Sequence, residues 1–346
     1  MKTIHIVGGG ITGCFLAYFL KDQFKVDLYE AKDKLGGLCS TEYNMEGIPY
    51  QKGSHVFYTD EAWILDILNK AVEFVPVEYL VGINPLFDLR YYNFPFDKYS
   101  LDLMPWHWKE AIRLDLQKAG GNTADNLEDL VTNYYGKTIY EIFYKSYFQK
   151  MLNFDGAQIH DIGWFQKFLR PIEDKVNYFP EKAYFPVEEG YNKVFAYLTR
   201  GVNVHLNSKV SRYDFAEGET VICTGRVDYF MDREERLPYI KFSFDVDSAM
   251  YAASKPDTVI FPNHTPFISI TQFGKFFPQH EKNIIVKDFT DGEEEAIPPL
   301  GYKISPFNSN IYFAGRQGSC QMLDMSDCVK QASVLAAQIK HKERTK

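Results

Sequence analysis

The hydrophobic positions at the start of the chain follow the spacing of a strand, then a helix, then a second strand. A short apolar run covers residues 4–7, and apolar side chains then recur every three or four positions over residues 11–20. A second short apolar run covers residues 26–29. This alternation predicts a strand–helix–strand unit, in which two parallel strands are joined by a helix that covers the sheet.

Glycines and one acid stand at the turns of this predicted unit. Gly8, Gly10 and Gly13 separate the first strand from the helix in a G-x-G-x-x-G spacing, and Glu30 follows the second strand. Glycine at these positions permits a tight turn, a close backbone approach to a pyrophosphate and tight helix–strand packing, while the acid can accept hydrogen bonds from a ribose. An ordinary glycine turn before a helix is the alternative. The strand, helix and acid together favour a dinucleotide-binding site.

Later segments alternate between strand-like and helical patterns. Residues 100–165 are mostly helical, with Asn126 expected to cap one helix and a Thr138–Glu141 capping box expected to open another. The strand-like segments, predicted to form a second sheet, are 76–99, 166–189 and 229–304. The remaining segments, 1–75, 190–228 and 305–346, are assigned to the nucleotide-binding domain. A last helix is expected to begin at Asp324 or Ser326.

Composition narrows the functional classes. The 346 residues carry a net charge of −8 without a long basic block, which disfavours nucleic-acid binding. No apolar run approaches the roughly 20 residues of a membrane span, and no signal peptide is evident. The five scattered cysteines indicate free thiols and a cytoplasmic protein, and no histidine pair has metal-ligand spacing. Aromatic residues make up 16%, which is compatible with a tightly packed core or a homodimer contact.

Several motifs resemble those of known flavoproteins. The continuation from Glu30 to Gly36-Gly37 resembles FAD proteins of the glutathione-reductase and amine-oxidase lineage. Residues 46–59, ending in Gly53-Ser54-His55-Val56-Phe57-Tyr58-Thr59, are similar to EGI…GAHIFHT of the UDP-galactopyranose mutase family. Phe313-Ala314-Gly315-Arg316 followed by Leu323-Asp324-Met325 is similar to that family's FGGR…YDM. The order and spacing of these stretches hold across nearly the whole chain.

This resemblance implies an α/β fold: an FAD-binding Rossmann-like domain with an inserted helical bundle and a twisted antiparallel sheet domain. It implies an isomerase that interconverts pyranose and furanose forms of a nucleotide-diphosphate sugar. In that family, N5 of reduced FAD attacks the anomeric carbon, and no net oxidation occurs. A nucleotide-sugar substrate and an external reductant, such as NAD(P)H or a reductase, are then the expected partners.

The resemblance also assigns site residues by their match to the motifs. His55 and Arg316 are the expected catalytic residues, although a core histidine and a surface arginine are the alternatives. Tyr147, Arg170 and Tyr184 are expected to contact the substrate. The residues expected to bind the cofactor are Gly8, Gly10, Gly13, Glu30, Gly36, Gly37, Gly315, Arg316, Asp324 and Met325.

The substrate half departs from the family pattern. A tryptophan that stacks on uracil is replaced by Leu152, and the segment matching the second diphosphate-binding arginine reads Pro266-Phe267-Ile268-Ser269-Ile270. Each lost charge-assisted bond costs about 1.5–3 kcal/mol, so weakened binding of UDP-galactose is expected unless other residues compensate. The lysines that could supply charge are Lys145, Lys150, Lys167 and Lys175.

Two other functional classes remain open on the sequence. An amine-oxidase-like FAD oxidoreductase acting on a small molecule would share the glycine fingerprint. A non-catalytic descendant that keeps FAD for structure is the third alternative.

Overall fold

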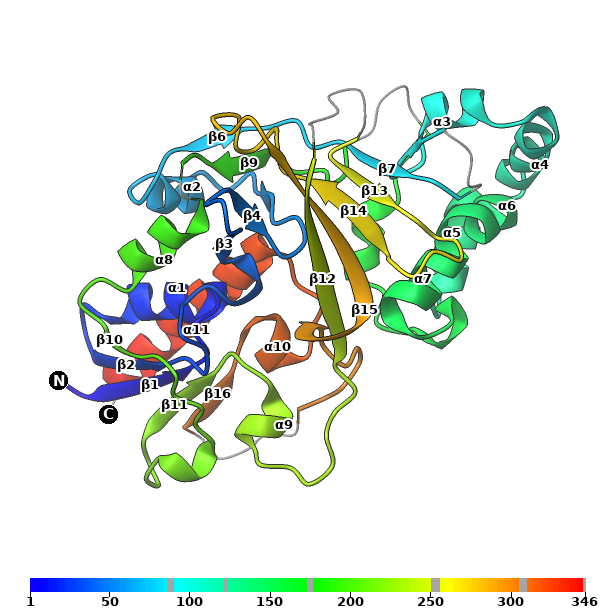
Figure 1. Ribbon diagram of the computed structural model, residues 1–346. Helices are drawn as coiled ribbons and strands as arrows, with labels where there is room; N and C mark the ends of the chain where they lie inside the picture. The colour runs from blue at the N-terminus through cyan, green and yellow to red at the C-terminus, as the bar shows by residue number, and fades with distance from the viewer. Residues whose placement is uncertain are drawn as a thin grey trace. The chain divides into compact units, whose positions relative to one another are not determined.

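The computed structural model describes residues 1–85, 90–120, 123–172, 177–188, 190–249, 256–304 and 310–344. The chain divides into two compact units, each built from segments that are far apart in the sequence (Figure 1). The first unit comprises Met1–Pro76, Tyr184–Tyr239 and Ala296–Lys346, and the second comprises Val77–Ala183 and Ile240–Glu295.

A parallel sheet forms the centre of the first unit. Its five strands lie in the order β10 (Asn203–His205), β2 (Lys25–Tyr29), β1 (Thr3–Val7), β11 (Thr220–Cys223) and β16 (Ile311–Phe313). Neighbouring strands in this sheet are parallel, with Ile6 opposite Leu28 on one side and Ile222 on the other. Central strands of a parallel sheet are covered on both faces, which explains why β1 and β11 read as unbroken apolar runs.

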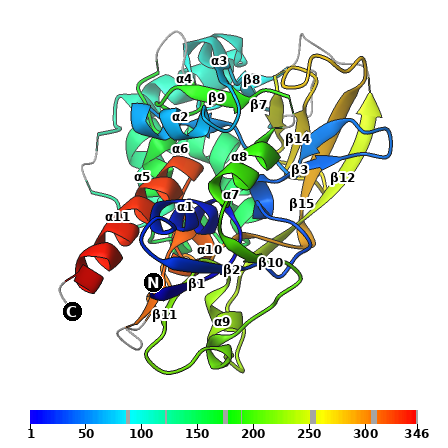
Figure 2. The same cartoon turned by 90° about the vertical axis from the view of Figure 1, so that its left-hand side faces the viewer.

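Helices α1 (Ile11–Leu20) and α11 (Met325–Arg344) pack against each other beside this sheet, and both views show them side by side (Figures 1 and 2). Almost every residue of α1 is buried, so this short helix is apolar all round. The long helix α11 buries one stripe that includes Val329, Ala332 and Ile339.

Short elements complete the first unit. The strands β3 (Thr41–Tyr43) and β4 (Pro49–Gln51) form a hairpin, and β5 (Phe57–Tyr58), β9 (Ala183–Pro186) and β6 (Phe74–Pro76) form a small sheet. The helical elements are η1 (Gly37–Cys39), α2 (Ala62–Leu68), α8 (Tyr191–Leu198), η5 (Arg212–Asp214), α9 (Val227–Phe230) and α10 (Gly315–Ser319).

A six-stranded sheet forms one layer of the second unit. Its order is β12 (Ile240–Ala249), β15 (Asn283–Ile297), β14 (Ser269–Gln272), β13 (Thr258–Ile260), β7 (Val81–Ile83) and β8 (Tyr92–Asn93). The β13–β14, β14–β15 and β7–β8 pairs are antiparallel. The strands β13 and β7, which come from distant segments of the chain, run parallel.

The helical part of the second unit has an aromatic core. Its elements are α3 (Lys98–Leu103), α4 (Trp106–Leu116), α5 (Leu127–Tyr135), α6 (Lys137–Ile139), the π-helix η2 (Tyr140–Tyr144), α7 (Lys145–Leu152), η3 (Gly156–Gln158) and η4 (Trp164–Phe168). The large aromatic side chains Tyr135, Tyr140, Phe143, Tyr144 and Phe148 are almost completely buried there. The high aromatic content therefore has a packing role.

The expected α/β fold, with a Rossmann-like part, a helical part and a second sheet, is confirmed. The helical segment and the second sheet lie within one compact unit, and the expected boundaries of three domains stay predictions. The Thr138 capping box is wrong. Gly136 precedes α6, and Thr138 instead hydrogen-bonds the Asp115 carboxylate through its backbone N–H and its hydroxyl, both at 2.7 Å.

Candidate functional site

The glycine turn between β1 and α1 leaves no room for a side chain at Gly8 or at Gly13. A Cβ on Gly13 would lie 1.9 Å from the Gly8 carbonyl oxygen, so a side chain there cannot be accommodated without a shift of the backbone. Gly8 has φ +106°, a conformation that other L-residues rarely adopt. Gly10 differs, because its φ is −72° and a Cβ there would have no neighbour within 4 Å. Gly10 therefore faces open space at the N-terminus of α1, where a phosphate would approach.

Glu30 lies at the end of β2, beside this turn. The side chain is buried, and its Oε2 accepts a hydrogen bond from the Gly9 N–H at 2.7 Å. Its Oε1 accepts from the Lys32 N–H at 2.8 Å. Each oxygen of an ionised carboxylate has a second lone pair, so the residue retains acceptor capacity for ribose hydroxyls.

The second glycine pair is bound directly to the first turn. The Gly36 N–H donates to the Gly9 carbonyl at 2.8 Å, and Gly10 and Gly36 form an isolated parallel bridge. Gly36 and Gly37 have φ values of +113° and +58°. The structure thus brings together two glycine-rich segments that are separated by more than twenty residues in sequence, as expected for a backbone-lined dinucleotide cradle.

The C-terminal site residues stand near the start of α1 in the same unit. A Cβ on Gly315, at the start of α10, would lie 2.5 Å from Thr12 Oγ1, so α10 fits there only with a glycine. Arg316 follows, and its Nε donates to the Leu323 carbonyl at 2.7 Å. Asp324 caps α11 by accepting from the Asp327 N–H at 2.8 Å, and Met325 is the first residue of that helix.

Two hydrogen bonds fix the backbone of His55, whereas one ring nitrogen has no hydrogen-bond partner among the described residues. The His55 N–H donates to Gln51 Oε1 at 3.0 Å, and the Tyr191 hydroxyl donates to the His55 carbonyl at 2.6 Å. Within the described chain, its buried Nδ1 has no hydrogen-bond partner. Burial, assisted by the nearby Arg316 guanidinium, lowers the pKa of His55 from 6.5 to about 4, so the imidazole is neutral at physiological pH.

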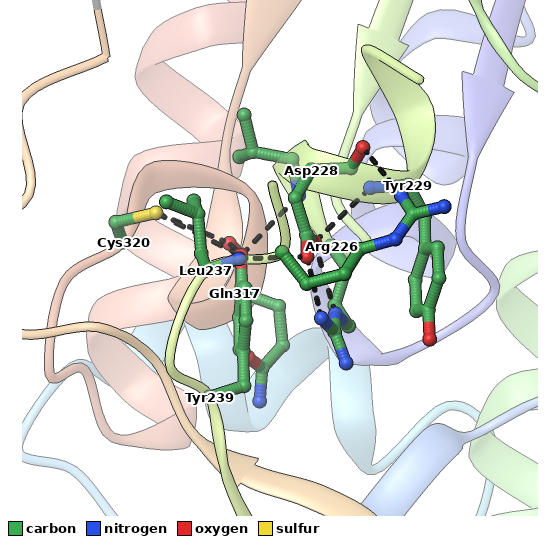
Figure 3. Close-up of polar contacts among 9 residues, drawn as sticks. Arg226, Asp228, Tyr229, Leu237, Tyr239, Gln317 and Cys320 are labelled. Carbon is green, nitrogen blue, oxygen red and sulfur yellow. Dashed lines mark hydrogen bonds and ion pairs between the residues drawn. The ribbon is translucent and has the colours of Figure 1, made fainter. Parts of the chain in front are cut away.

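A buried ion pair connects the segment after β11 to helix α10 (Figure 3). The Arg226 guanidinium pairs with the fully buried Asp228 carboxylate at 2.5 Å, and its centre lies 4.1 Å from the Tyr229 ring and 4.4 Å from the Tyr239 ring. The Tyr239 hydroxyl accepts from the Val227 N–H at 3.2 Å and donates to the Gln317 carbonyl of α10 at 3.0 Å. This network supports the helix that carries Arg316.

The Asp228 carboxylate is fully used by its neighbours. Besides Arg226, the backbone N–H groups of Tyr229 and Leu237 donate to it at 3.0 and 3.1 Å. These hydrogen bonds and the guanidinium lower the pKa of Asp228 against the opposing effect of burial. None of the motifs singled out in the sequence predicts this network. The available signal is the Arg-x-Asp spacing directly after a strand.

The three expected substrate residues have different surroundings. Tyr147 is buried on α7 and packs edge-on against Phe94 at a centroid distance of 5.8 Å. The Arg170 guanidinium is occupied by three backbone carbonyls, those of Lys167, Asn177 and Tyr178. Tyr184 lies on β9 opposite Pro76 and belongs to the first unit, whereas Tyr147 and Arg170 belong to the second. Their roles toward a substrate stay predictions.

The candidate lysines also differ. Lys145 pairs with Glu141 at 2.9 Å, and Lys167 lies 4.0 Å from Glu181, so the charges of both are balanced locally. The Lys150 ammonium group hydrogen-bonds only neutral oxygens, at Phe261, Thr265 and Phe267. Lys175 lies outside the described residues. Among the residues that the structure describes, no group of three or more potential ligands could hold a metal ion, and no helix is long and apolar enough to cross a membrane.

The two glycines of the first turn give a matched pair of variants. Gly13→Ala should lower the unfolding free energy of the cofactor-free chain by about 1–3 kcal/mol because its methyl group meets the Gly8 carbonyl. Gly10→Ala should leave that free energy within about 0.5 kcal/mol, yet weaken FAD binding about tenfold by filling the open space. Urea unfolding measures the unfolding free energy of each variant, and a flavin fluorescence titration measures its affinity for FAD. Normal FAD affinity in Gly10→Ala would contradict the placement of the pyrophosphate.

Removing the cation of the Arg226–Asp228 pair tests the support of α10. Arg226→Met should destabilise the protein by about 3–5 kcal/mol, because a buried carboxylate loses its only cationic partner in the described structure. Arg236→Met is the control: this exposed side chain also stacks on Tyr229, at 4.4 Å, so its loss should cost less than about 1 kcal/mol. Equal destabilisation of the two variants by urea unfolding would show that the buried pair is not the important element.

The lowered pKa of His55 predicts a pH dependence of stability. Between pH 6.5 and about 4 the unfolded chain binds a proton at His55 that the folded chain does not, so stability falls as the pH is lowered through this window. His55→Gln should reduce this loss by about 2 kcal/mol. Unfolding free energies at pH 7 and pH 4.5 measure the difference. An unchanged loss in His55→Gln would contradict the neutral imidazole.

Comparison with known proteins agrees with this geometry. Residues 6–71 match the model of the NAD(P)-binding Rossmann-like domain. The chain is 25% identical to dTDP-fucopyranose mutase of Escherichia coli, covering 96% of this chain and 97% of that protein. It is 21% identical to a probable UDP-galactopyranose mutase of Klebsiella pneumoniae, covering 96% and 93%.

Solved structures show the same fold. The crystal structure of reduced UDP-galactopyranose mutase superposes with a TM-score of 0.78 at 16% identity, over 99% of this chain and 96% of that chain. Putrescine oxidase superposes with a TM-score of 0.63 at 14% identity, over 98% and 99%. The resemblance to the UDP-galactopyranose mutase family that the sequence motifs indicate is thus confirmed along nearly the whole chain.

Proposed function

We propose that this chain is a flavin-dependent isomerase that interconverts the pyranose and furanose forms of a nucleotide-diphosphate sugar. One observation carries the proposal: two pyranose mutases match more than nine-tenths of the chain. The glycine-rich segments that meet at Gly10 and Gly36, and the His55 Nδ1 that has no partner among the described residues, support it. The dTDP-linked sugar of the Escherichia coli relative makes dTDP-fucose the first substrate to test, and UDP-galactose the second.

The residues of the first unit fit FAD. Gly10 faces open space at the start of α1, and Glu30 stands beside it with acceptor capacity. Gly36 and Gly37 extend the backbone-lined surface, and Gly315 brings α10 against Thr12. In this proposal Glu30 accepts from the adenosine ribose, the glycines lie along the pyrophosphate, and Arg316, Asp324 and Met325 lie toward the flavin end.

Reduced FAD would supply a nucleophilic N5 atom for the anomeric carbon and would leave the reaction in its starting redox state, so an external reductant is needed only to prime the enzyme. The protein's own contribution is placement and charge. Arg316 supplies a fixed cation near the flavin, and neutral His55 offers the hydrogen-bonding capacity of Nδ1 without adding a second charge. Preorganised groups of this kind lose little free energy to rearrangement during the reaction.

The substrate contacts proposed from the family are less uniform. Tyr147 has an aromatic neighbourhood suited to a nucleobase. Arg170 would have to exchange one of its three backbone partners for a diphosphate oxygen, so its proposed contact requires a local rearrangement. Tyr184 completes the proposed set.

An anaerobic product assay tests the proposed function. Flavin-loaded protein, reduced with dithionite, should convert dTDP-fucopyranose to the furanose form, and the oxidised protein should not. Gly10→Ala is the matched control. It is expected to fold normally but to bind FAD more weakly, so at limiting FAD it should form less product than the wild type. Chromatography of the nucleotide sugars gives the readout. Failure of fully loaded, reduced protein to isomerise any member of a nucleotide-sugar panel would contradict the proposal.

The fold match to putrescine oxidase favours one alternative, an amine-oxidase-like FAD oxidoreductase that acts on a small molecule. Such an enzyme would reduce its flavin with substrate and consume oxygen. A mutase gives no net oxidation, so oxygen uptake with an amine panel separates the two.

A further inference from the structure

One face of the sheet in the second unit carries a row of buried polar side chains. Asp288 of β15 lies directly opposite Ser269 of β14, and Thr271 of β14 lies opposite Thr258 of β13. The Thr258 and Thr271 hydroxyls are 2.7 Å apart, and the Tyr79 hydroxyl is 2.6 Å from Thr258 Oγ1. These hydroxyls satisfy one another. Asp288 is the exception in the row.

Asp288 is a buried carboxyl group with one oxygen in use. The Ser269 hydroxyl donates to its Oδ2 at 2.5 Å. Its Oδ1 is buried and has no hydrogen-bond partner in the part of the chain that the structure describes. The residue is 8% exposed. A buried carboxyl oxygen without a partner costs on the order of 1–3 kcal/mol, which indicates that a further group belongs there.

Lys150 of α7 contacts the segment of residues 261–267, which leads into β14. Its Nζ donates to the Phe261 and Phe267 carbonyls at 2.8 Å each and to Thr265 Oγ1 at 3.1 Å. No described carboxylate forms an ion pair with it, and desolvation lowers its pKa to about 8. A half-buried cation that contacts only neutral oxygens leaves a positive charge uncompensated on this face.

Lys150 and Asp288 are linked through the segment that leads into β14. Lys150 contacts the Phe267 carbonyl, and the N–H of the next residue, Ile268, donates to the Asp288 backbone carbonyl at 2.7 Å. Tyr147 lies three residues before Lys150 on α7, and the Asp288 charge acts on the Tyr147 hydroxyl. Tyr147 itself is buried. Ser269 itself stands in the segment that matches a diphosphate-binding arginine in the resembled family.

We propose that Asp288, presented by Ser269 and assisted by the charge of Lys150, donates a hydrogen bond to an anionic oxygen of the substrate's diphosphate. This inference rests on the proposed function, because it supplies the anion contact that the missing arginine leaves open. A neutral carboxylic acid can donate from Oδ1 while Oδ2 accepts from Ser269, and an O–H···O⁻ bond is among the stronger hydrogen bonds.

The protonation state of Asp288 determines how anion binding should change with pH. Burial raises the pKa of Asp288 to about 7, so the donor form is present below neutral pH and is replaced by a repelling carboxylate above it. The other ionisable groups on this face are Tyr147 and Lys150 of α7, with Tyr79 and Tyr178 around Tyr147. Lys287, next in sequence, pairs instead with Asp245 and Asp247 of β12. Loss of the Asp288 proton and loss of the Lys150 charge both weaken anion binding as the pH rises.

Calorimetric titration with dTDP and UDP, between pH 7 and pH 9, tests this inference on the oxidised, flavin-loaded protein. The nucleotide itself titrates at both ends of this range, at its terminal phosphate and at the N3–H of its base, so the effect of Asp288 is read from the difference between the wild type and Asp288→Asn, which bind the same ligand. Wild-type affinity should fall at least about tenfold from pH 7 to pH 9, following the loss of the donor form. Asp288→Asn retains a donor of the same shape at every pH, and its affinity at pH 9 should exceed that of the wild type about fivefold or more. Lys150→Gln should weaken binding at pH 7 while keeping the fall that Asp288 causes.

Three results would overturn the inference. Equal pH slopes in the wild type and Asp288→Asn would show that Asp288 does not contact the diphosphate. An affinity that rises with pH would show that ionised Asp288 accepts a hydrogen bond from a sugar or base donor instead. Absence of binding to any nucleoside diphosphate at any pH would overturn both this inference and the proposed function, whereas the first two results leave the proposed function standing. Circular dichroism of each variant confirms folding.

Discussion

The close approach of α1 to the end of β1 is the constraint on which the first unit depends. With no side chain at Gly13, the helix can lie against the Gly8 carbonyl, and this directs its free N–H groups toward the space in front of Gly10. The same closeness recurs at Gly315, where α10 meets Thr12, and at Gly318, where a Cβ would lie 2.4 Å from the Cys223 carbonyl. Segments separated by some 300 residues thus converge where the Gly315 backbone meets the Thr12 side chain. A dinucleotide bound there would contact mostly backbone, which tolerates sequence change around the glycines.

Each unit contains a buried aspartate, and the two aspartates differ in how many hydrogen bonds their carboxyl groups accept. Asp228 in the first unit receives a guanidinium and two backbone N–H groups, and its charge is fully compensated. Asp288 in the second unit receives one hydroxyl and keeps an open oxygen. The first arrangement is what a structural ion pair requires, because every lone pair that burial would penalise has a donor. The second leaves a polar atom for another group, which is why we assign it to the substrate.

Local sequence signals predicted the elements that local interactions define. The glycine turn, the Asn126 cap and the Asp324 cap could be read from the sequence because each depends on residues within a few positions. The Thr138 capping box failed because Asp115, more than twenty residues away, captured the threonine. Arg170 and Asp288 could not have been placed for a related reason. Their surroundings come from loop closure and from the cross-strand register, which no short motif encodes.

We infer that the first unit binds FAD rather than a nicotinamide dinucleotide. Calorimetric titration of the cofactor-free wild-type chain with FAD, and separately with NAD⁺ and NADP⁺, distinguishes the two. We expect one FAD bound per chain with an affinity at least about a hundredfold above that of either nicotinamide cofactor, a difference of about 2.7 kcal/mol. Preferential binding of NAD⁺ or NADP⁺, with no saturable binding of FAD, would contradict it.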